Sequence, residues 1–388
     1  MRIGIDARFF GPIGKGLGRY TQKLIENLEK ISVKGDESHQ YFIFLKSENF
    51  DEYKPKNPNF QKIKADYHWY TFSEQIWFPW LLKKYKLDAV HFPHFNVPLL
   101  YFGKFVVTIH DLILINFPTL RGSTLSPLFY KIKFLAYKIV IKHAIKKSSR
   151  ILAVSNFTKK DILKNYSFVP PEKVIVTYEA CEDYCMLSPN KDKEILSRYA
   201  IKKPYIMYVG NAYPHKNLEK LIMAFKLIKQ KKADLSLVFV GKVDYFYERL
   251  KNLVESESIS DVLFVGYAMD YELDTIFHNA AAYAFPSLYE GFGLPPLEAM
   301  AKGTPVASSD HPCMKEILGN SAHYFKGEDI SDISRAIIDI LEDENLRKKL
   351  ISRGYERIKK YSWKNMARNT REVYNSIGTR QKYAKEKE

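Results

Sequence analysis

Hydrophobic residues follow two alternating patterns along the chain: short continuous runs, and longer stretches with an apolar residue every three or four positions. The short runs are rich in β-branched and aromatic residues, which is typical of strands buried on both faces of a parallel sheet. Strands are therefore expected at residues 2–8, 40–46, 88–93, 105–111, 150–155 and 173–178, and again at 205–210, 235–241, 262–267, 281–287 and 304–309.

The longer stretches predict helices that pack on these sheets. In 217–230, NLEKLIMAFKLIKQ, the apolar positions recur at intervals of three and four, as on one face of a helix. These positions are Leu218, Leu221, Ile222, Phe225 and Ile228. Strands that alternate with such helices predict an α/β protein with two Rossmann-like, doubly wound parallel sheets.

The length of 388 residues also favours two domains, because single cores rarely grow that large. The strand–helix series is interrupted once, by the polar stretch 186–204. We therefore expect a first domain at 1–185, a linker at 186–204 and a second domain at 205–361. Two doubly wound sheets place ligands at the carboxyl ends of their strands, so a cleft between the domains is the expected binding site.

Composition indicates an ordinary globular protein, with 46% apolar and 27% charged residues. There is no uninterrupted apolar run of about 18 residues, and MRIGIDARFF at the start lacks the features of a signal peptide. The three cysteines, Cys181, Cys185 and Cys313, have neither a disulfide pattern nor the spacing of a metal site. These features predict a cytoplasmic protein.

The net charge of +16 indicates an anionic partner, such as nucleic acid, acidic lipid or a phosphorylated small molecule. The densest basic stretch is 131–150, in which lysines recur near helical spacing among apolar residues. These lysines include Lys131, Lys138, Lys142 and Lys146. The stretch is interpreted either as a solvated outer helix face or as a helix resting on the inner face of an acidic membrane.

Two glutamates, Glu290 and Glu298, bracket a turn where a predicted strand gives way to a helix that starts near Leu294. An acid near a helix start can simply complement the helix dipole, but this explains Glu298 and not Glu290. The glycines of GFG (291–293) allow a ligand close to the backbone, and a helix start presents N–H groups to an anion. Carboxylates suit neutral hydroxyls, so the turn predicts a nucleotide-sugar site.

With this element the chain resembles the retaining glycosyltransferases of the GT4 type, which have the two-domain GT-B fold. The resemblance covers nearly the whole chain. It rests on EGFGLPPLEAMAKGTPV (290–306), YVGNAYPHKNLEKLIMAF (208–225), GYAMDYELDTIFHNA (266–280), TIHDL (108–112), AVSNFTKKDIL (153–163) and GKGLGRY (14–20).

The resemblance implies roles for residues of the second domain. Glu290 would contact hydroxyls of the donor sugar and Glu298 the ribose, while Lys216 would neutralise the diphosphate. Many members have an arginine after the glycine of the preceding loop, whereas here Asn211 follows Gly210. The remaining expected donor contacts are the backbone around Phe292, Gly293 and Leu294, the loop at Gly210 and Asn211, and Tyr267 near the base.

The resemblance also implies two sites in the first domain. His110, beside Asp111 at the end of an expected strand, would lie next to the reacting sugar. The glycine-rich turn 11–20 does not have the GxGxxG spacing of a dinucleotide fingerprint. It is interpreted either as a flexible connection or as a turn whose Gly14, Gly16 and Gly18, with Arg19, admit donor or acceptor. His91 and His94 have no evident third ligand, and the family implies no metal cofactor.

The function implied is transfer of a hexose from a nucleoside-diphosphate sugar to a glycan or lipid-linked glycan, with retention at the anomeric carbon. The segments quoted above resemble those of mannosyltransferases of polysaccharide and O-antigen assembly. This resemblance implies GDP-mannose as the donor, with UDP-glucose as the other candidate. A nucleotide-sugar epimerase of the same fold and a basic nucleic-acid-binding protein remain as alternatives. Against the latter, the sequence has no RNA-binding or zinc signature. The family further implies that the last helix, 362–377, packs back on the first domain.

Overall fold

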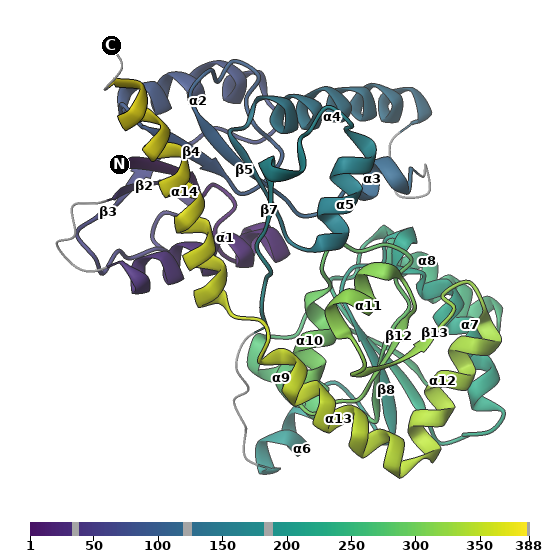
Figure 1. The fold of residues 1–388 in the computed structure, drawn as a ribbon. Helices are drawn as coiled ribbons and strands as arrows, with labels where there is room; N and C mark the ends of the chain where they lie inside the picture. The colour runs from purple at the N-terminus through teal and green to yellow at the C-terminus, as the bar shows by residue number, and fades with distance from the viewer. Residues whose placement is uncertain (33–38, 119–125, 182–188, 386–388) are drawn as a thin grey trace. The chain divides into compact units, whose positions relative to one another are not determined.

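A computed structural model of the chain describes residues 1–32, 39–118, 126–181 and 189–385 (Figure 1). The chain forms two compact units. The first consists of Met1–Leu112, Leu125–Glu179 and Ser362–Glu388, and the second of Ile113–Thr124 and Ala180–Tyr361. Cys185 and the expected boundary between residues 185 and 186 lie outside the described residues.

The first unit is built on a parallel sheet of seven strands in the order β3-β2-β1-β4-β5-β6-β7. In register, Ile3 lies opposite Tyr41 on one side and Ala89 on the other. The strands are β1 (Arg2–Asp6), β2 (Gln40–Leu45), β3 (Phe60–Lys64), β4 (Ala89–Phe92), β5 (Phe105–Ile109), β6 (Arg150–Ala153) and β7 (Val174–Val176).

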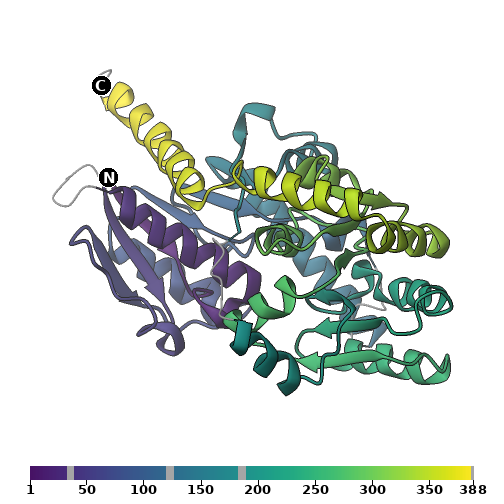
Figure 2. The same cartoon turned by 90° about the horizontal axis from the view of Figure 1, so that it is seen from below.

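Helices cover both faces of this sheet. They are η1 (Pro12–Gly14), α1 (Lys15–Ile31), η2 (Ser47–Asn49), α2 (Phe72–Lys84), α4 (Pro127–Lys147), α5 (Asn156–Asn165), η4 (Pro171–Lys173) and α14 (Trp363–Lys385). Right-handed crossovers place α1 on one face and α2, α4 and α5 on the other. The C-terminal helix α14 lies beside α1 (Figure 2), where Arg371 Nη1 donates a hydrogen bond of 2.9 Å to the Ile31 carbonyl.

The second unit contains a parallel sheet of six strands in the order β10-β9-β8-β11-β12-β13. Helix α12 packs with α7 and helix α13 with α10, so helices again cover both faces. Its elements are α3 (Ile113–Asn116), α6 (Pro189–Arg198), β8 (Tyr205–Val209), η5 (Pro214–Lys216), α7 (Leu218–Lys229), β9 (Ser236–Val240), α8 (Tyr245–Ser256), β10 (Val262–Gly266), α9 (Asp270–His278), β11 (Ala282–Phe285), α10 (Leu294–Ala301), β12 (Val306–Ser309), α11 (Pro312–Leu318), β13 (Ala322–Phe325), α12 (Ile330–Glu342) and α13 (Glu344–Ile358).

The predicted doubly wound α/β class is confirmed, and every expected strand is present. Two strands escaped the sequence analysis, β3 and β13, which are edge strands of their sheets. In β3, FQKIK, only Phe60 is buried, so the continuous apolar run that marks an interior strand is missing. The five apolar positions expected on one helix face are all buried in α7.

The expected linker, 186–204, is described from residue 189 onward. It contains α6, which packs against α9 of the second unit. Asp192 accepts a hydrogen bond of 3.1 Å from Asn279, and Arg198 forms an ion pair of 2.5 Å with Glu272. The polar composition of this stretch thus reflects a partly exposed helix that is held by polar contacts.

Candidate functional site

The two sheets each reverse their strand order once, between β8 and β11 in the second unit and between β1 and β4 in the first. Doubly wound sheets bind ligands outside the carboxyl ends of the strands at such a switch point. Ligand-binding residues are therefore expected at these strand ends in each unit.

In the second unit, Lys216 and Glu290 meet beyond the ends of β8 and β11. Lys216 Nζ lies 2.6 Å from Glu290 Oε1, and Glu290 is only 7% exposed. Burial alone would raise the pKa of this carboxyl group, but the charge and hydrogen bond of Lys216, together with the other polar neighbours, outweigh burial and lower the pKa. Glu290 is therefore a buried carboxylate with the partly buried ammonium group of Lys216 as its counter-ion.

The loop that carries Lys216 is held in place by backbone and side-chain hydrogen bonds. The Leu288 N–H donates a bond of 2.8 Å to the His215 carbonyl, which joins the loop after β8 to the loop after β11. Asn217 is in the left-handed conformation (φ 60°), and its Nδ2 donates to the carbonyls of Pro286 at 3.2 Å and Gly327 at 2.7 Å. Asn217 was not identified from the sequence, although asparagine before a helix is the residue type that tolerates this conformation.

His215 lies beside the ion pair and stays neutral. Burial, and next the positive charge of Lys216, lower its pKa to about 4. The chain between β5 and α4 also reaches this place, a contact that the sequence analysis did not predict. Asn116 Nδ2 donates 3.0 Å to the Tyr289 hydroxyl, and the Phe117 ring lies 6.4 Å from the His215 ring.

The second glutamate of the motif, Glu298, lies in α10. Both Glu298 and Glu290 act on the buried hydroxyl of Tyr283, whose pKa is raised first by burial and then by the two carboxylates, Glu298 more strongly. The tyrosine hydroxyl donates to the Val209 carbonyl at the end of β8. The charges of both glutamates therefore act on the same tyrosine of β11.

Between the glutamates, Gly293 leads directly into α10. Its φ is 91°, and an added Cβ would lie 2.7 Å from Met314 Cε, so only glycine fits without displacement. Pro295 and Pro296 in the first turn have no N–H groups. The amide of Leu294 is therefore among the few that this helix start presents to an anion. The Phe292 ring is buried and packs edge-on against Tyr361 at 5.5 Å, so this side chain has a structural role.

The loop that follows β8 is also held by hydrogen bonds. Gly210 has φ 142°, and its carbonyl accepts 2.7 Å from the Tyr247 hydroxyl. The Asn211 carbonyl accepts 2.9 Å from Tyr208. Tyr267, by contrast, follows the edge strand β10 and is 73% exposed. It lies apart from Lys216 and Glu290 in the sheet order.

In the first unit, His110 follows β5, with both ring nitrogens engaged. Nδ1 lies 3.0 Å from Glu179 Oε1, and Nε2 lies 2.9 Å from the Pro93 carbonyl. Both partners can only accept, so both nitrogens must donate, as in an imidazolium ion. Burial lowers the pKa of His110, but the hydrogen bond and charge of Glu179 outweigh it, and the pKa is raised.

His91 is fully buried, whereas His94 is partly exposed. His91 Nδ1 lies 2.6 Å from the Tyr374 hydroxyl and its Nε2 lies 2.8 Å from Thr108 Oγ1, which joins α14 to the sheet. Burial lowers the pKa of both His91 and His94 to about 3, so they are neutral. Among the described residues, no group of three histidine, cysteine or acidic side chains is arranged to hold a metal ion.

The glycines of the glycine-rich turn 11–20 differ in their surroundings. An added Cβ on Gly14 would lie 2.1 Å from the Phe9 carbonyl oxygen, and one on Gly18 would lie 2.0 Å from that of Gly11. These two glycines allow the start of α1 to pack on the preceding loop. An added Cβ on Gly16 would have no atom within 4 Å, and Arg19 follows in the first turns of α1.

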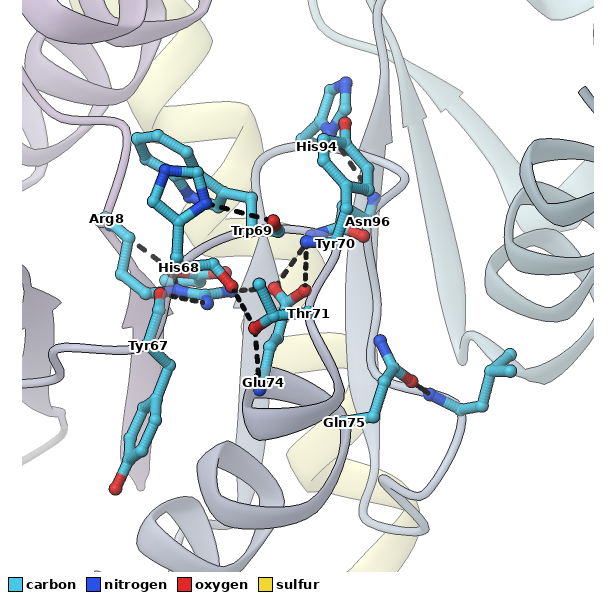
Figure 3. Close-up of polar contacts among 12 residues, drawn as sticks. Arg8, Tyr67, His68, Trp69, Tyr70, Thr71, Glu74, Gln75, His94 and Asn96 are labelled. Carbon is cyan, nitrogen blue, oxygen red and sulfur yellow. Dashed lines mark hydrogen bonds and ion pairs between the residues drawn. The ribbon is translucent and has the colours of Figure 1, made fainter. Parts of the chain in front are cut away.

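A buried ionic cluster at the switch point of the first unit was not foreseen (Figure 3). Arg8 is fully buried, and its Nη2 lies 2.7 Å from both Asp6 and Glu74. Glu74 also accepts 2.7 Å from Asn96 Nδ2 and 2.7 Å from the Tyr70 N–H. Tyr70 has φ 61°, so the cluster holds a strained backbone conformation just before α2. In the sequence, only the position of Asp6 and Arg8 at the end of a predicted strand could have indicated this cluster.

Comparison with known proteins agrees with this architecture. The family model described as Glycosyltransferase Family 4 matches residues 14–181, and the model described as Glycosyl transferases group 1 matches residues 191–357. The O-antigen chain mannosyltransferase RfbU of Salmonella typhimurium is 31% identical over 302 residues, which are 77% of this chain and 76% of that protein. The O-antigen chain mannosyltransferase B of Escherichia coli is 28% identical over 299 residues, 76% of each chain.

Solved structures show the same fold at low sequence identity. Sucrose-phosphate synthase from Thermosynechococcus elongatus has a TM-score of 0.75 at 18% identity and covers 98% of this chain and 99% of its own. WaaG, a glycosyltransferase involved in lipopolysaccharide biosynthesis, has a TM-score of 0.72 at 14% identity, with 96% and 99% covered. The chain thus belongs to the GT4-type glycosyltransferases and has their GT-B fold.

Proposed function

We propose that the protein transfers a hexose from a nucleoside-diphosphate sugar to a hydroxyl group of a glycan or lipid-linked glycan, with retention at the anomeric carbon. Mannose from GDP-mannose is the first candidate, because relatives over about three quarters of the chain are named mannosyltransferases. UDP-glucose is the second, since the structurally similar HepE of Anabaena is described in complex with UDP-glucose. Glycosyltransferase activity itself follows from family membership.

The observation that carries the proposal is the ion pair of Lys216 with the buried Glu290 beside the start of α10. In the proposed complex the donor diphosphate takes the place of the carboxylate as counter-ion of Lys216, and the backbone amides at Phe292, Gly293 and Leu294 bind the same phosphates. Glu290 then accepts hydrogen bonds from hydroxyls of the sugar. A dry site with fixed charges stabilises developing charge better than water does.

In the proposed reaction the bond between the anomeric carbon and the diphosphate oxygen breaks, and the acceptor oxygen bonds to the same face of that carbon. The acceptor proton passes to the departing diphosphate. Lys216 and the amides of the α10 start stabilise the negative charge that the leaving group gains. No metal ion takes part in this proposal, because the ammonium and the amides supply the positive charge.

The remaining assignments belong to the same proposal. Glu298 binds the ribose, the loop at Gly210 and Asn211 contacts the nucleotide, and Tyr267 lies near the base. His110 is assigned to the reacting sugar, with its ring oriented by Glu179 and its main chain available for a hydroxyl. Gly16, Gly18 and Arg19 are assigned to the donor or acceptor, Gly18 through its backbone.

The test is a transfer assay with purified protein, GDP-mannose or UDP-glucose, and a glycan acceptor. Wild type is expected to transfer one of the two sugars, with the anomeric configuration retained in the product by NMR. Glu290→Gln is expected to lose at least about 100-fold in kcat/KM, since an interaction with the transition state is removed. Full activity of this variant, or turnover of the nucleotide sugar to an isomer without acceptor, would contradict the proposal.

A further inference from the structure

One face of the first unit carries many exposed apolar side chains, which we call the α2–α4 face. The connections from β3 to β4 and from β5 to β6 run in the same direction across the sheet, so α2 and α4 lie on the same side (Figure 1). The face comprises Phe72, Ile76, Trp77 and Trp80 of α2, Leu100 and Phe102 of the intervening segment, and Leu128, Phe129, Ile132, Leu135 and Ile139 of α4.

The segment between β4 and β5 joins the two helices into one block. Asn96 Nδ2 donates to Glu74 of α2, and the Leu99 N–H donates 2.7 Å to Gln75 Oε1 of the same helix. On the other side, the Phe95 ring contacts Tyr137 of α4 with 4.9 Å between ring centroids. The exposed side chains on all three parts therefore belong to one surface of one unit.

In α4 the exposed apolar residues form a stripe opposite the buried side of the helix. Leu128, Ile132, Leu135 and Ile139 follow at intervals of four, three and four, which places them on one side of a helix with 3.6 residues per turn. The buried residues, including Ile141 and Ala144, point to the other side. A helix that only covers the sheet needs one apolar face, and α4 has a second one toward solvent.

Helix α2 has the same character. Phe72, Ile76 and Trp80 follow at intervals of four and are exposed, Phe72 by 90%, while Phe78 and Leu82 face the core. Trp77 adds a second exposed indole ring next to this row. Tryptophan favours the interface between water and lipid, where its apolar ring is embedded and its N–H remains hydrated.

The charges on this face have one sign. Helix α4 contains six lysines and no acidic residue, and α2 ends with Lys83 and Lys84. The lysines of α4 are Lys131, Lys133, Lys138, Lys142, Lys146 and Lys147, all of which are exposed. Within the described ranges of the chain, none of these six forms an ion pair with an acidic side chain.

The single acidic residue of α2 does not oppose this charge. Glu74 is fully buried and faces Arg8, on the side of the helix away from solvent (Figure 3). In the sequence, Asp111 is the one acidic residue between Asp88 and Asp161. The exposed face thus combines large apolar side chains with lysines, and α2, α4 and the segment between β4 and β5 contribute no exposed carboxylate to it.

We propose that the α2–α4 face binds the surface of an anionic lipid bilayer, with both helices lying in the interfacial plane. Apolar rows flanked by lysines suit the acyl boundary and the acidic headgroups together. The lysines could bind the phosphates of a nucleic acid, but the two rows of aliphatic and aromatic side chains would find no matching contacts there. No helix of the described chain has the length and apolarity to cross a bilayer, so the contact is peripheral.

The test is co-sedimentation of the full-length protein with vesicles of phosphatidylcholine alone or with about one third phosphatidylglycerol. We expect binding to the anionic vesicles only, weakened by added salt because the surface potential is screened. Lys131→Glu/Lys138→Glu/Lys142→Glu is expected to weaken binding about 100-fold or more, from the contribution of each lysine near an anionic surface. Trp77→Ser/Trp80→Ser and Leu135→Ser/Ile139→Ser are each expected to weaken it about 10-fold or more.

Matched controls separate the face from net charge and general hydrophobicity. Lys202→Glu/Lys349→Glu/Lys360→Glu changes the net charge equally with exposed lysines of the second unit. Phe168→Ser/Tyr245→Ser removes two exposed aromatic residues elsewhere. Both controls should bind anionic vesicles like wild type. The substituted side chains of the face are exposed, so unchanged circular dichroism and thermal unfolding are expected and are recorded for every variant.

The proposal would be overturned if wild type did not bind anionic vesicles, or bound both vesicle types equally. It would also be overturned if the face variants and the control variants lost vesicle binding equally. A wild-type dimer that does not bind vesicles and that the face variants convert to monomers would overturn it as well. Loss of RNA retention in the face variants, with no vesicle binding by wild type, would likewise reject it in favour of a nucleic-acid surface. The vesicle assay contains no sugar donor, so its outcome is independent of the proposed transferase reaction.

Discussion

Lys216 and Glu290, 74 residues apart in the chain, form an ion pair of 2.6 Å between the loops that follow the neighbouring strands β8 and β11. Both side chains are largely shielded from water, with 14% and 9% exposure. The two side chains that the proposed donor requires are therefore held in contact with each other.

The first prediction concerns the two members of this pair. Lys216→Met leaves the Glu290 carboxylate buried without its counter-ion, so the free energy of unfolding is expected to fall by about 3–5 kcal/mol. Lys216→Met/Glu290→Gln removes both charges and should recover most of this stability without recovering binding of the nucleotide sugar. Urea unfolding and calorimetric titration with GDP-mannose and UDP-glucose measure the two effects.

The nearby exposed pair Lys220–Glu328 provides the control. Lys220→Met is expected to change stability by less than about 1 kcal/mol, because exposed ion pairs contribute little. Recovery of nucleotide-sugar binding in the double variant at position 216 and 290 would show that the pair serves stability alone.

The pair of Lys216 and Glu290 also predicts that the free energy of unfolding depends on pH. The pKa of Glu290 is lowered in the folded protein, since Lys216 and the other polar neighbours together outweigh the effect of burial. Its contribution is therefore complete above the unfolded value of about 4.5 and is lost as the pH falls through the lower folded value. Unfolding free energies measured from about pH 6 to pH 3 should fall less steeply for Lys216→Met/Glu290→Gln than for wild type. Parallel curves for the two proteins would refute this assignment.

Glu179 is expected to govern the protonation of His110. The raised pKa of His110 means that its stabilising contribution is complete below the unfolded value of about 6.5 and is lost as the pH rises through the folded value. Glu179→Gln removes the charge and leaves burial, which lowers the pKa. The stability difference between wild type and variant should be largest near pH 6 and shrink toward pH 9, and a two-dimensional NMR titration of the His110 ring should report the lower pKa directly. A difference that stays constant over this range would contradict the role of Glu179.

Gly293 allows a comparison of backbone strain with steric contact. Gly293→Ala should destabilise the protein by the strain of a positive φ, about 1–2 kcal/mol, and further through contact of the new methyl group with Met314. Gly266→Ala is the matched control, because Gly266 also has a positive φ (76°) but no atom within 4 Å of an added Cβ. The loss for Gly293→Ala should exceed that for Gly266→Ala in thermal or urea unfolding. Equal losses would mean that the space beside Met314 accommodates the methyl group.

Arg8 is expected to be the most sensitive charged residue of the first unit. Arg8→Met leaves Asp6 and Glu74 buried together, so a loss of about 3–5 kcal/mol is expected, together with release of the strained turn at Tyr70. Arg335, which also pairs with two carboxylates but is 47% exposed, is the control, and Arg335→Met should cost less than about 1 kcal/mol. Urea unfolding measures both values. Similar losses in the two variants would show that the buried cluster contributes no more than a surface network.

Interior strands and the donor motif could be recognised from the sequence because their signals are local. A strand such as β9, SLVFV, is buried along its whole length, and its continuous apolar run needs no knowledge of its neighbours. The turn between Glu290 and Glu298 is likewise encoded within a few residues, by glycines and prolines at a helix start. Edge strands such as β3 lacked this signal, since only one of its residues is buried.

The amino-acid sequence alone determined the doubly wound class, the interior strands and the residue types around the α10 start, because each has a signal within a short segment of the chain. Only the tertiary structure decided which distant groups meet. Lys216 pairs with Glu290, Arg8 with Glu74, and His91 with Tyr374, 283 residues away. It also decided which apolar rows of α2 and α4 remain exposed. Such pairings depend on strand order and on the face that each helix covers, and periodicity within one segment carries no information about either.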